Sequence, residues 1–316
     1  MIPAAFPPWT RAETLGASVP EFAAFQDEPP QMSSGTVGKT GFLRLGFERR
    51  SGTTILANLE RRAPYMVQRA LHCDEQMPGL AYVFLITTTG CLLQGDRLAL
   101  DVTLRPRAQA HITSQSATKI HAMDANYAAQ SQTITLADDA YLEFLPDPVI
   151  PHRHSRFISD TQISIAPSAT LLLSEIIQPG RKHHHPDECF GATVFSISTA
   201  AARPDGRPLF AEKLVIEPRR YVMRQTGVMD SFDVFANVIL CAPKNKVERI
   251  HDRVLADVNR AEGMAFGACR LPNDAGLIFK VLGRETAQVK AKVREFWGVV
   301  RKEVVGAELP PPYLWR

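Results

Sequence analysis

Cysteines are few in this sequence, and they are scattered. The five stand far apart in the 316 residues, and no two of them form a Cys-x-x-Cys pair. A disulfide framework or a thiolate zinc site would need cysteines at short, paired spacing. We therefore expect neither, and interpret the cysteines as buried thiols of an intracellular protein.

Long apolar runs and a strong net charge are also missing. The longest apolar run, Leu80 to Thr89, is far shorter than the about 20 residues that a membrane helix needs. The N-terminus lacks the basic start and apolar centre of a secretory signal. A net charge of only +3, without a basic stripe between aromatic residues, argues against nucleic acid as a partner. We expect a cytoplasmic protein that contacts neither membrane nor nucleic acid.

Motifs of activated nucleophiles and catalytic metals are absent. The chain contains no Gly-x-Ser-x-Gly, no His-Glu-x-x-His and no Asp-x-Asp loop. Gly38-Lys39-Thr40 resembles the end of a phosphate-binding loop, but Ser33 stands where that loop needs its first glycine. We predict that the protein is not an enzyme.

Short alternating segments dominate the chain between about residues 40 and 241. In Leu43–Glu48 and Leu98–Leu104, apolar residues occupy every second position, which is the period of a half-buried strand. Turn residues such as Pro204-Asp205-Gly206 separate these segments. The pattern predicts a mostly β fold, with a long antiparallel β-sheet domain.

Two later segments have helical spacing instead. Apolar residues recur every three or four positions in 246–260 and in 286–305, and the second segment has Lys and Arg on its other face. We predict an α-helix in each. Residues 1–38 are rich in proline, and we predict a loosely ordered N-terminal extension there, followed by one β-rich domain over 39–316.

Histidines offer two candidate metal sites. On a loop, two imidazoles of the internal run His183-His184-His185 could bind Ni²⁺ or Zn²⁺, although an adventitious site on a solvated loop explains the run as well. His152 and His154 would lie on one face of a strand and could form a weak site. A metal-dependent hydrolase that uses these histidines is one alternative for the function.

Two acids stand among apolar residues. Glu143 lies within Leu142–Leu145, and Glu175 lies between two apolar runs. A carboxylate that faces a core must be paired, bind a metal or reach water. Because neighbours on a strand alternate between faces, an ordinary outward-facing acid is an equally good interpretation.

Five blocks of sequence follow one another in order. Thr89–Leu98 is rich in glycine near its start and contains Gly95-Asp96 after an apolar strand. The other blocks are Thr54–Arg69, Gln115–Ile120, Ala140–Pro146 and Leu171–Arg181. Together they resemble the UreD (UreH) family of urease accessory proteins, over roughly residues 39–316. The chain departs from the family pattern at Ala63–Tyr65, at Thr88–Cys91 and at the His run, which suggests a divergent member.

The resemblance implies a β-rich protein with two helices that takes part in urease maturation. Such proteins bind the urease apoprotein and the accessory protein UreF, which recruits the nickel-carrying GTPase UreG. An internal path through the protein passes nickel toward urease. By this resemblance we expect a scaffold and metal conduit with transient Ni²⁺ and no tightly bound cofactor; a structural adaptor without a metal path is the other alternative.

Candidate residues follow from matching positions. Asp96, Thr118 and Glu175 match family positions and are our candidates for the nickel path; Glu143 is added from its own apolar context. Weak oxygen ligands of this kind suit a conduit, which must release what it binds. The predicted C-terminal helix also resembles the family, and its candidates for partner contact are Phe296, Trp297 and Arg301.

Overall fold

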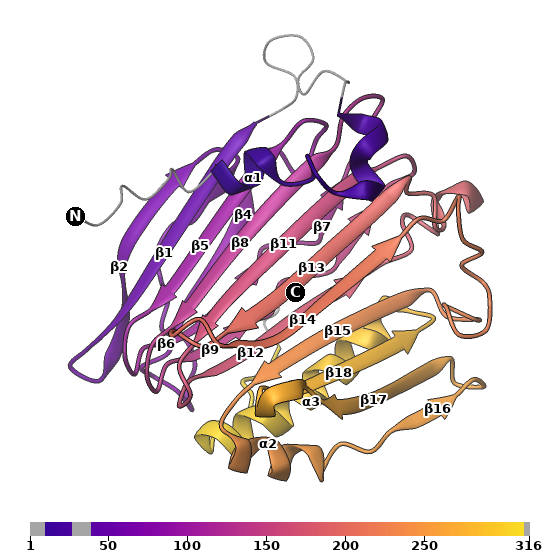
Figure 1. The fold of residues 1–316 in the computed structure, drawn as a ribbon. Helices are drawn as coiled ribbons and strands as arrows, with labels where there is room; N and C mark the ends of the chain where they lie inside the picture. The colour runs from indigo at the N-terminus through magenta and orange to yellow at the C-terminus, as the bar shows by residue number, and fades with distance from the viewer. Residues whose placement is uncertain (1–9, 27–38, 313–316) are drawn as a thin grey trace.

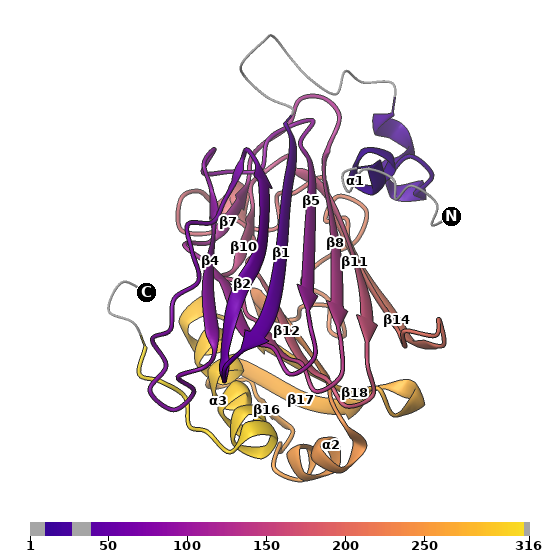
Figure 2. The ribbon, with the colours of Figure 1, turned by 90° about the vertical axis from the view of Figure 1, so that its left-hand side faces the viewer.

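The computed structural model describes residues 10–26 and 39–312, and these form a mostly β molecule. Two large sheets pack face to face (Figures 1 and 2). Helices α2 (Lys244–His251) and α3 (Thr286–Val305) lie outside the second sheet, near the last strands of the chain. The predicted β-rich class is therefore confirmed.

The first sheet has seven strands in the order β14-β13-β11-β8-β5-β1-β2. Their bounds are β1 Thr40–Arg50, β2 Thr53–Arg62, β5 Arg97–Leu104, β8 Ala128–Leu136, β11 Arg156–Ile165, β13 Val194–Ala202 and β14 Pro208–Ile216.

The second sheet has eleven strands, nine of them in the order β16-β17-β18-β15-β12-β9-β6-β4-β3. These are β3 Tyr65–Met66, β4 Ala81–Thr87, β6 Gln109–Ser114, β9 Tyr141–Phe144, β12 Thr170–Ile177, β15 Val234–Cys241, β16 Asp257–Asn259, β17 Met264–Arg270 and β18 Gly276–Gly283. The short strands β7 (Thr118–Ile120) and β10 (Val149–Pro151) pair with each other, and β10 also pairs with β12.

Both sheets are mixed, so the predicted long antiparallel sheet is wrong. Strands β5, β8, β11 and β13 run parallel, and so do β4, β6, β9 and β12. The reason is the path of the chain, which passes from one sheet to the other between β4 and β13. Each of β5, β8 and β11 is therefore followed by one or two strands of the second sheet before the chain returns to form its parallel neighbour in the first sheet.

Apolar side chains fill the space between the sheets. Leu45, Leu100 and Ile134 from the first sheet and Leu142 and Leu171 from the second are all fully buried there. Leu45, Leu100 and Ile134 belong to alternating segments, and the alternation sends every second side chain inward. Strand β12 is apolar on both faces, because Leu172 packs in the cluster under α3 while Leu171 faces the first sheet.

The prediction of a helix over 286–305 is confirmed by α3, whose apolar stripe, including Phe296 and Val300, packs on the outer face of the second sheet. The predicted helix over 246–260 is wrong beyond His251, where α2 ends. Leu255 and Val258, which extend the helical spacing, are 79% and 63% exposed, so no buried face requires the helix to continue.

Two short helices, α1 (Thr10–Thr14) and the 3₁₀ helix η1 (Pro20–Phe25), lie against the outer face of the first sheet (Figure 2). Phe22 is fully buried beside Tyr127, and the Arg11 guanidinium pairs with Asp160 at 2.8 Å. The predicted division of the chain at residue 38 stays a prediction, and the other residues of the N-terminal segment lie outside the described ranges.

All five cysteines are free thiols. Cys241 is buried, but Cys73 and Cys269 are exposed, so the expectation of buried thiols is wrong for these two. Cys73 lies between β3 and β4, and Cys269 lies near the end of β17; the spacing of cysteines alone does not indicate their exposure.

Candidate functional site

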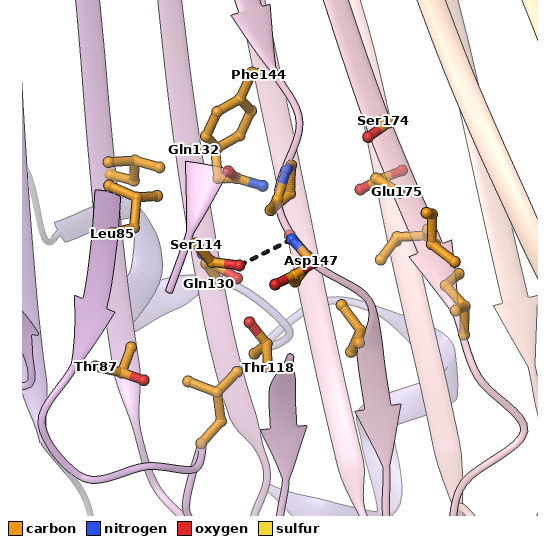
Figure 3. Close-up of a pocket in the computed structure, with 18 of the residues that line it drawn as sticks. Leu85, Thr87, Ser114, Thr118, Gln130, Gln132, Phe144, Asp147, Ser174 and Glu175 are labelled. Carbon is orange, nitrogen blue, oxygen red and sulfur yellow. Dashed lines mark hydrogen bonds between the residues drawn. The ribbon is translucent and has the colours of Figure 1, made fainter. Parts of the chain in front are cut away.

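A cavity of about 130 Å³ lies between the two sheets (Figure 3). Strands β8, β11 and β13 line it from the first sheet, and β4, β6, β9 and β12 line it from the second. Its polar lining consists of hydroxyl, amide and carboxyl side chains: Thr87, Ser114, Gln115, Ser116, Thr118, Gln130, Gln132, Asp147, Ser159, Ser174 and Glu175.

Many of these polar groups are held in place by hydrogen bonds. The Gln130 amide donates to the Tyr65 hydroxyl at 2.9 Å, and the Ser114 hydroxyl accepts from the backbone N–H of Asp147 at 2.9 Å (Figure 3). Buried polar groups are costly unless they are paired or wet. The lining therefore combines apolar side chains, among them Phe144, Phe157 and Leu173, with many side-chain oxygen atoms and few charges.

Glu175 is the acid of this cavity whose charge is most perturbed. It points from β12 toward the first sheet, and Figure 3 shows its carboxyl group beside the cavity. Burial, with the Glu212 carboxylate nearby, raises the pKa of Glu175 to about 7, against an opposing hydrogen bond from Asn237. Near neutral pH this carboxyl group is therefore partly protonated.

Of the other predicted path residues, only Thr118 lines the cavity. Asp96 is fully buried in the turn before β5, where its two carboxylate oxygens accept the backbone N–H groups of Lys39 and Leu93, both at 2.8 Å. Burial raises the pKa of Asp96 in spite of these bonds. This geometry is that of an acid that holds a turn together.

Glu143 faces the opposite side of the second sheet, toward α3. Its Oε1 accepts from the Tyr141 hydroxyl at 2.6 Å, from the Trp297 indole at 2.7 Å and from the Arg301 Nε at 2.8 Å. Its Oε2 accepts from Arg301 Nη2 at 2.9 Å and lies 2.7 Å from His111 Nδ1. Burial opposes its charge, but the bonds from His111 and Arg301 lower the pKa of Glu143 to about 2. Glu143 is therefore an ion-paired structural acid and does not line the cavity.

A second cavity, of about 220 Å³, lies between α3 and the second sheet. It shares Pro146, Asp147, Ser174 and Ile176 with the first cavity, and Asp147 pairs with Lys290 of α3 at 2.8 Å. Sequence reasoning missed Asp147, Ser114 and the glutamines of the first cavity. For Ser114 and for Gln130 and Gln132, polar residues at inward positions of β6 and β8 were the available signal, whereas Asp147 lies between β9 and β10 and has no strand pattern to mark it.

Known proteins resemble this chain over nearly its whole length. The UreD urease accessory protein family matches residues 39–316. The chain belongs to the UreD family.

Three relatives, all named urease accessory proteins, show the extent of the similarity. Urease accessory protein UreD of Photorhabdus laumondii is 54% identical over 306 residues, which are 97% of this chain and 95% of the relative. The protein of the same name from Yersinia enterocolitica is 53% identical over 316 residues, with 98% and 97% covered. Urease accessory protein UreD 2 of Brucella suis is 51% identical over 295 residues, with 93% and 98% covered. Membership of this family assigns the chain an accessory role in urease maturation.

The predicted partner contacts of this UreD-family chain are not on its surface. Phe296 and Trp297 are 3% and 6% exposed, and Arg301 is fully buried between Glu143 and Asp74. In this conformation these side chains attach α3 to the sheet. A helical stripe in the sequence does not distinguish a face that binds a partner from one that binds the protein's own sheet.

The histidines do not form the cluster that a hydrolase would need. Within residues 10–26 and 39–312, no three His, Cys, Asp or Glu side chains are arranged to hold a metal ion. The run His183–His185 lies on an exposed loop. Strand β10 ends at Pro151, so His152 and His154 do not share a strand face; the His154 Nδ1 accepts from Arg219 at 2.7 Å, whereas His152 is buried.

In the part of the chain that the structure describes, no helix has the length and apolar character needed to cross a membrane. The apolar run near Leu80 is instead part of β4, in the interior of the second sheet. Its hydrophobicity is explained by burial between neighbouring strands.

Proposed function

We propose that this UreD-family chain is a scaffold and nickel conduit of urease maturation. It binds the urease apoprotein and UreF, and through UreF the GTPase UreG, in the cytoplasm. Nickel passes through its interior as transient cargo, and the chain itself catalyses no reaction.

The observation that carries this proposal is the polar cavity between the sheets. Side chains of sequence-distant strands converge there, and two residues chosen from sequence alone, Thr118 and Glu175, are among them. Hydroxyl, amide and carboxylate oxygens bind Ni²⁺ more weakly than thiolates or imidazoles do, so the ion can move from one to the next.

Glu175 supplies the charge of this passage. With a pKa of about 7 it is partly protonated at neutral pH, and an arriving divalent cation displaces the proton. When the cation leaves, the carboxyl group takes up a proton again. The site therefore does not hold an uncompensated negative charge between transfers.

The alternative of a metal hydrolase has no support in the arrangement of the histidines described above. A structural adaptor without a metal path remains the competing function. The conduit and the adaptor predict different nickel contents of urease when Glu175 is replaced by the neutral residue Gln, which has nearly the same size.

The experiment compares Glu175→Gln with the control Glu60→Gln. Glu60 is an exposed acid on β2 whose carboxylate pairs with Arg44 of β1. For each variant, the yield of the complex with urease and UreF is measured together with nickel per urease active site. We expect Glu175→Gln to assemble normally but to yield urease with several-fold less nickel, and the control to match the wild type. Full nickel content with Glu175→Gln would exclude this residue from the path, and a parallel loss of assembly would favour the adaptor.

A further inference from the structure

Two histidines that are far apart in the sequence meet where β7 and β10 end. These strands are parallel, with Ile120 opposite Pro151. His121 and His152 follow directly, and the register continues because the His152 N–H donates to the Ile120 carbonyl at 2.9 Å. Their imidazole centroids are 5.7 Å apart, with 51° between the ring planes.

The separation of the rings matches that of two imidazoles on one metal ion. Metal–nitrogen bonds are about 2.1 Å, so two rings on one tetrahedral ion have centroids roughly 5–6 Å apart.

Each ring also leaves a nitrogen available. His121 is exposed, and its Nδ1 lies 3.1 Å from the Ala122 carbonyl, an acceptor that requires the proton on Nδ1. The lone pair is then on Nε2, as in many metal-binding histidines whose other nitrogen donates to a carbonyl. His152 is only 8% exposed, and its buried Nε2 has no hydrogen-bond partner within the described residues. An unpaired buried ring nitrogen is costly unless a ligand satisfies it.

We propose that His121 and His152 form a two-histidine site for a divalent transition-metal ion such as Ni²⁺. Imidazole nitrogen is a preferred ligand of Ni²⁺ and Zn²⁺. The exposed His121 opens the site to solvent, and water fills the remaining coordination positions.

Charges around the site make its binding exchangeable. Arg181 and Lys119 are near enough to disfavour a cation at His152, whereas the Glu188 carboxylate favours one. With two protein ligands and these opposing charges, the site captures a metal ion without holding it permanently.

The site lies close to the passage between the sheets. Thr118 and Val149, the first residues of β7 and β10, line the cavity, and the histidines lie just past the other ends of these strands. At about 3.3 Å per residue, the histidines are roughly 10 Å along the strands from the cavity lining. Use of the site in nickel transfer rests on the proposed function, but metal binding itself does not.

The test is a calorimetric titration of untagged full-length protein with Ni²⁺, in a background where His183, His184 and His185 are all replaced by Ala. This background removes the exposed run as a competing site. We expect His121→Ala to weaken the binding of one Ni²⁺ per chain at least about tenfold, because one of two imidazole ligands is lost. The matched control His154→Ala, whose ring contacts Arg219, should bind as the background does. Unchanged affinity with His121→Ala would overturn the proposal.

A second measurement needs no substitution at the site. Diethyl pyrocarbonate modifies exposed imidazoles, and mass spectrometry reads the rate at each histidine. Ni²⁺ should slow the modification of His121 about tenfold, as expected for a ligand nitrogen that is occupied, and leave His251 unchanged. An unchanged rate at His121 would overturn the proposal. Both readouts concern the chain alone, so their failure leaves the conduit through Glu175 untouched.

Discussion

Glu143 and Glu175 stand in similar apolar sequences on adjacent strands, β9 and β12, yet their environments are opposite. The register places Leu172 beside Glu143, so Glu143 points toward α3 while Glu175 points toward the first sheet. In both cases burial disfavours the charge. At Glu143, the bonds from His111 and Arg301 outweigh the effect of burial, and the pKa falls to about 2. At Glu175, the nearby Glu212 carboxylate adds to the effect of burial, and the pKa rises to about 7.

The groups around each acid determine its charge state. Glu143 faces a guanidinium that satisfies both of its oxygens, so its charge is permanent and holds α3 in place. Glu175 lines the cavity and has a second acid, Glu212, nearby, so it is partly protonated near neutral pH. One acid stabilises the fold, and the other is the acid to which we assign nickel transfer in the proposed function.

The largest effect is expected from removal of Arg301, the charged partner of Glu143. Arg301→Met should lower the free energy of unfolding by about 3–5 kcal/mol, because Glu143 and Asp74 stay buried and lose the guanidinium that pairs with both of them. Urea denaturation measures this loss. The control Lys302→Met changes the next residue, whose side chain is 50% exposed, and should cost less than about 1 kcal/mol. Equal losses for both variants would show that the buried network does not hold α3.

Asp96 tests whether an acid at a family position has a structural role instead of a role in nickel transfer. Asp96→Ala should lower the free energy of unfolding by roughly 1–3 kcal/mol, because the N–H groups of Lys39 and Leu93 lose their acceptors. Thermal unfolding measures the change, and Asp96→Asn, which keeps one oxygen, should lose less. Normal stability of Asp96→Ala together with poor nickel transfer would return Asp96 to the path.

Glu175 makes a prediction about pH. Its folded pKa of about 7 lies above the ordinary 4.5, so its contribution to stability is complete below pH 4.5 and is lost as the pH rises through 7. Glu175→Gln cannot ionise, so it should be more stable than the wild type at pH 8 by on the order of 1–2 kcal/mol, a gain that shrinks toward pH 4.5. Denaturation curves at pH 5 and pH 8 test this. A difference independent of pH would mean that Glu175 does not titrate in this range.

The smallest effect on stability is expected from the exposed histidine run. Replacement of His183, His184 and His185 by Ala should change the free energy of unfolding by less than about 0.5 kcal/mol, because these side chains are at the surface. The variant should bind less Ni²⁺ in solution and still activate urease. Loss of activation comparable to deletion of the whole chain would show that the loop is central.

Local patterns in the sequence identified local features of the fold. The stripe over 286–305 predicted α3 because twenty residues of consistent spacing leave little room for another structure. The same spacing failed after His251, where two apolar residues continue the pattern without a surface to cover. The period of two identified strands, but it says nothing about which strand lies beside which, so the parallel pairing was missed.

The site was predicted only where family positions indicated it. Thr118 and Glu175 line the cavity, but nothing in the sequence around Glu143 reveals that Arg301 lies across from it. The pairing of His121 with His152 was missed for the same reason, because it depends on the register of β7 and β10. Both contacts join segments that are far apart in the sequence, so local sequence patterns do not reveal them.

The passage of the chain between the two sheets has a consequence for folding kinetics. None of the described strands from β5 to β11 pairs with the strand that comes directly after it in the sequence. Arg97 of β5 pairs with Ala129 of β8, and Phe157 of β11 pairs with Phe195 of β13. Each closure brings together ends separated by a whole excursion through the other sheet, and its entropy is lost before the contacts form. Until β13 is in place, growing edges of parallel sheet expose unpaired N–H and C=O groups beside apolar side chains. A newly made chain should therefore fold slowly and be prone to aggregation, and anything that binds an open edge early will raise its yield.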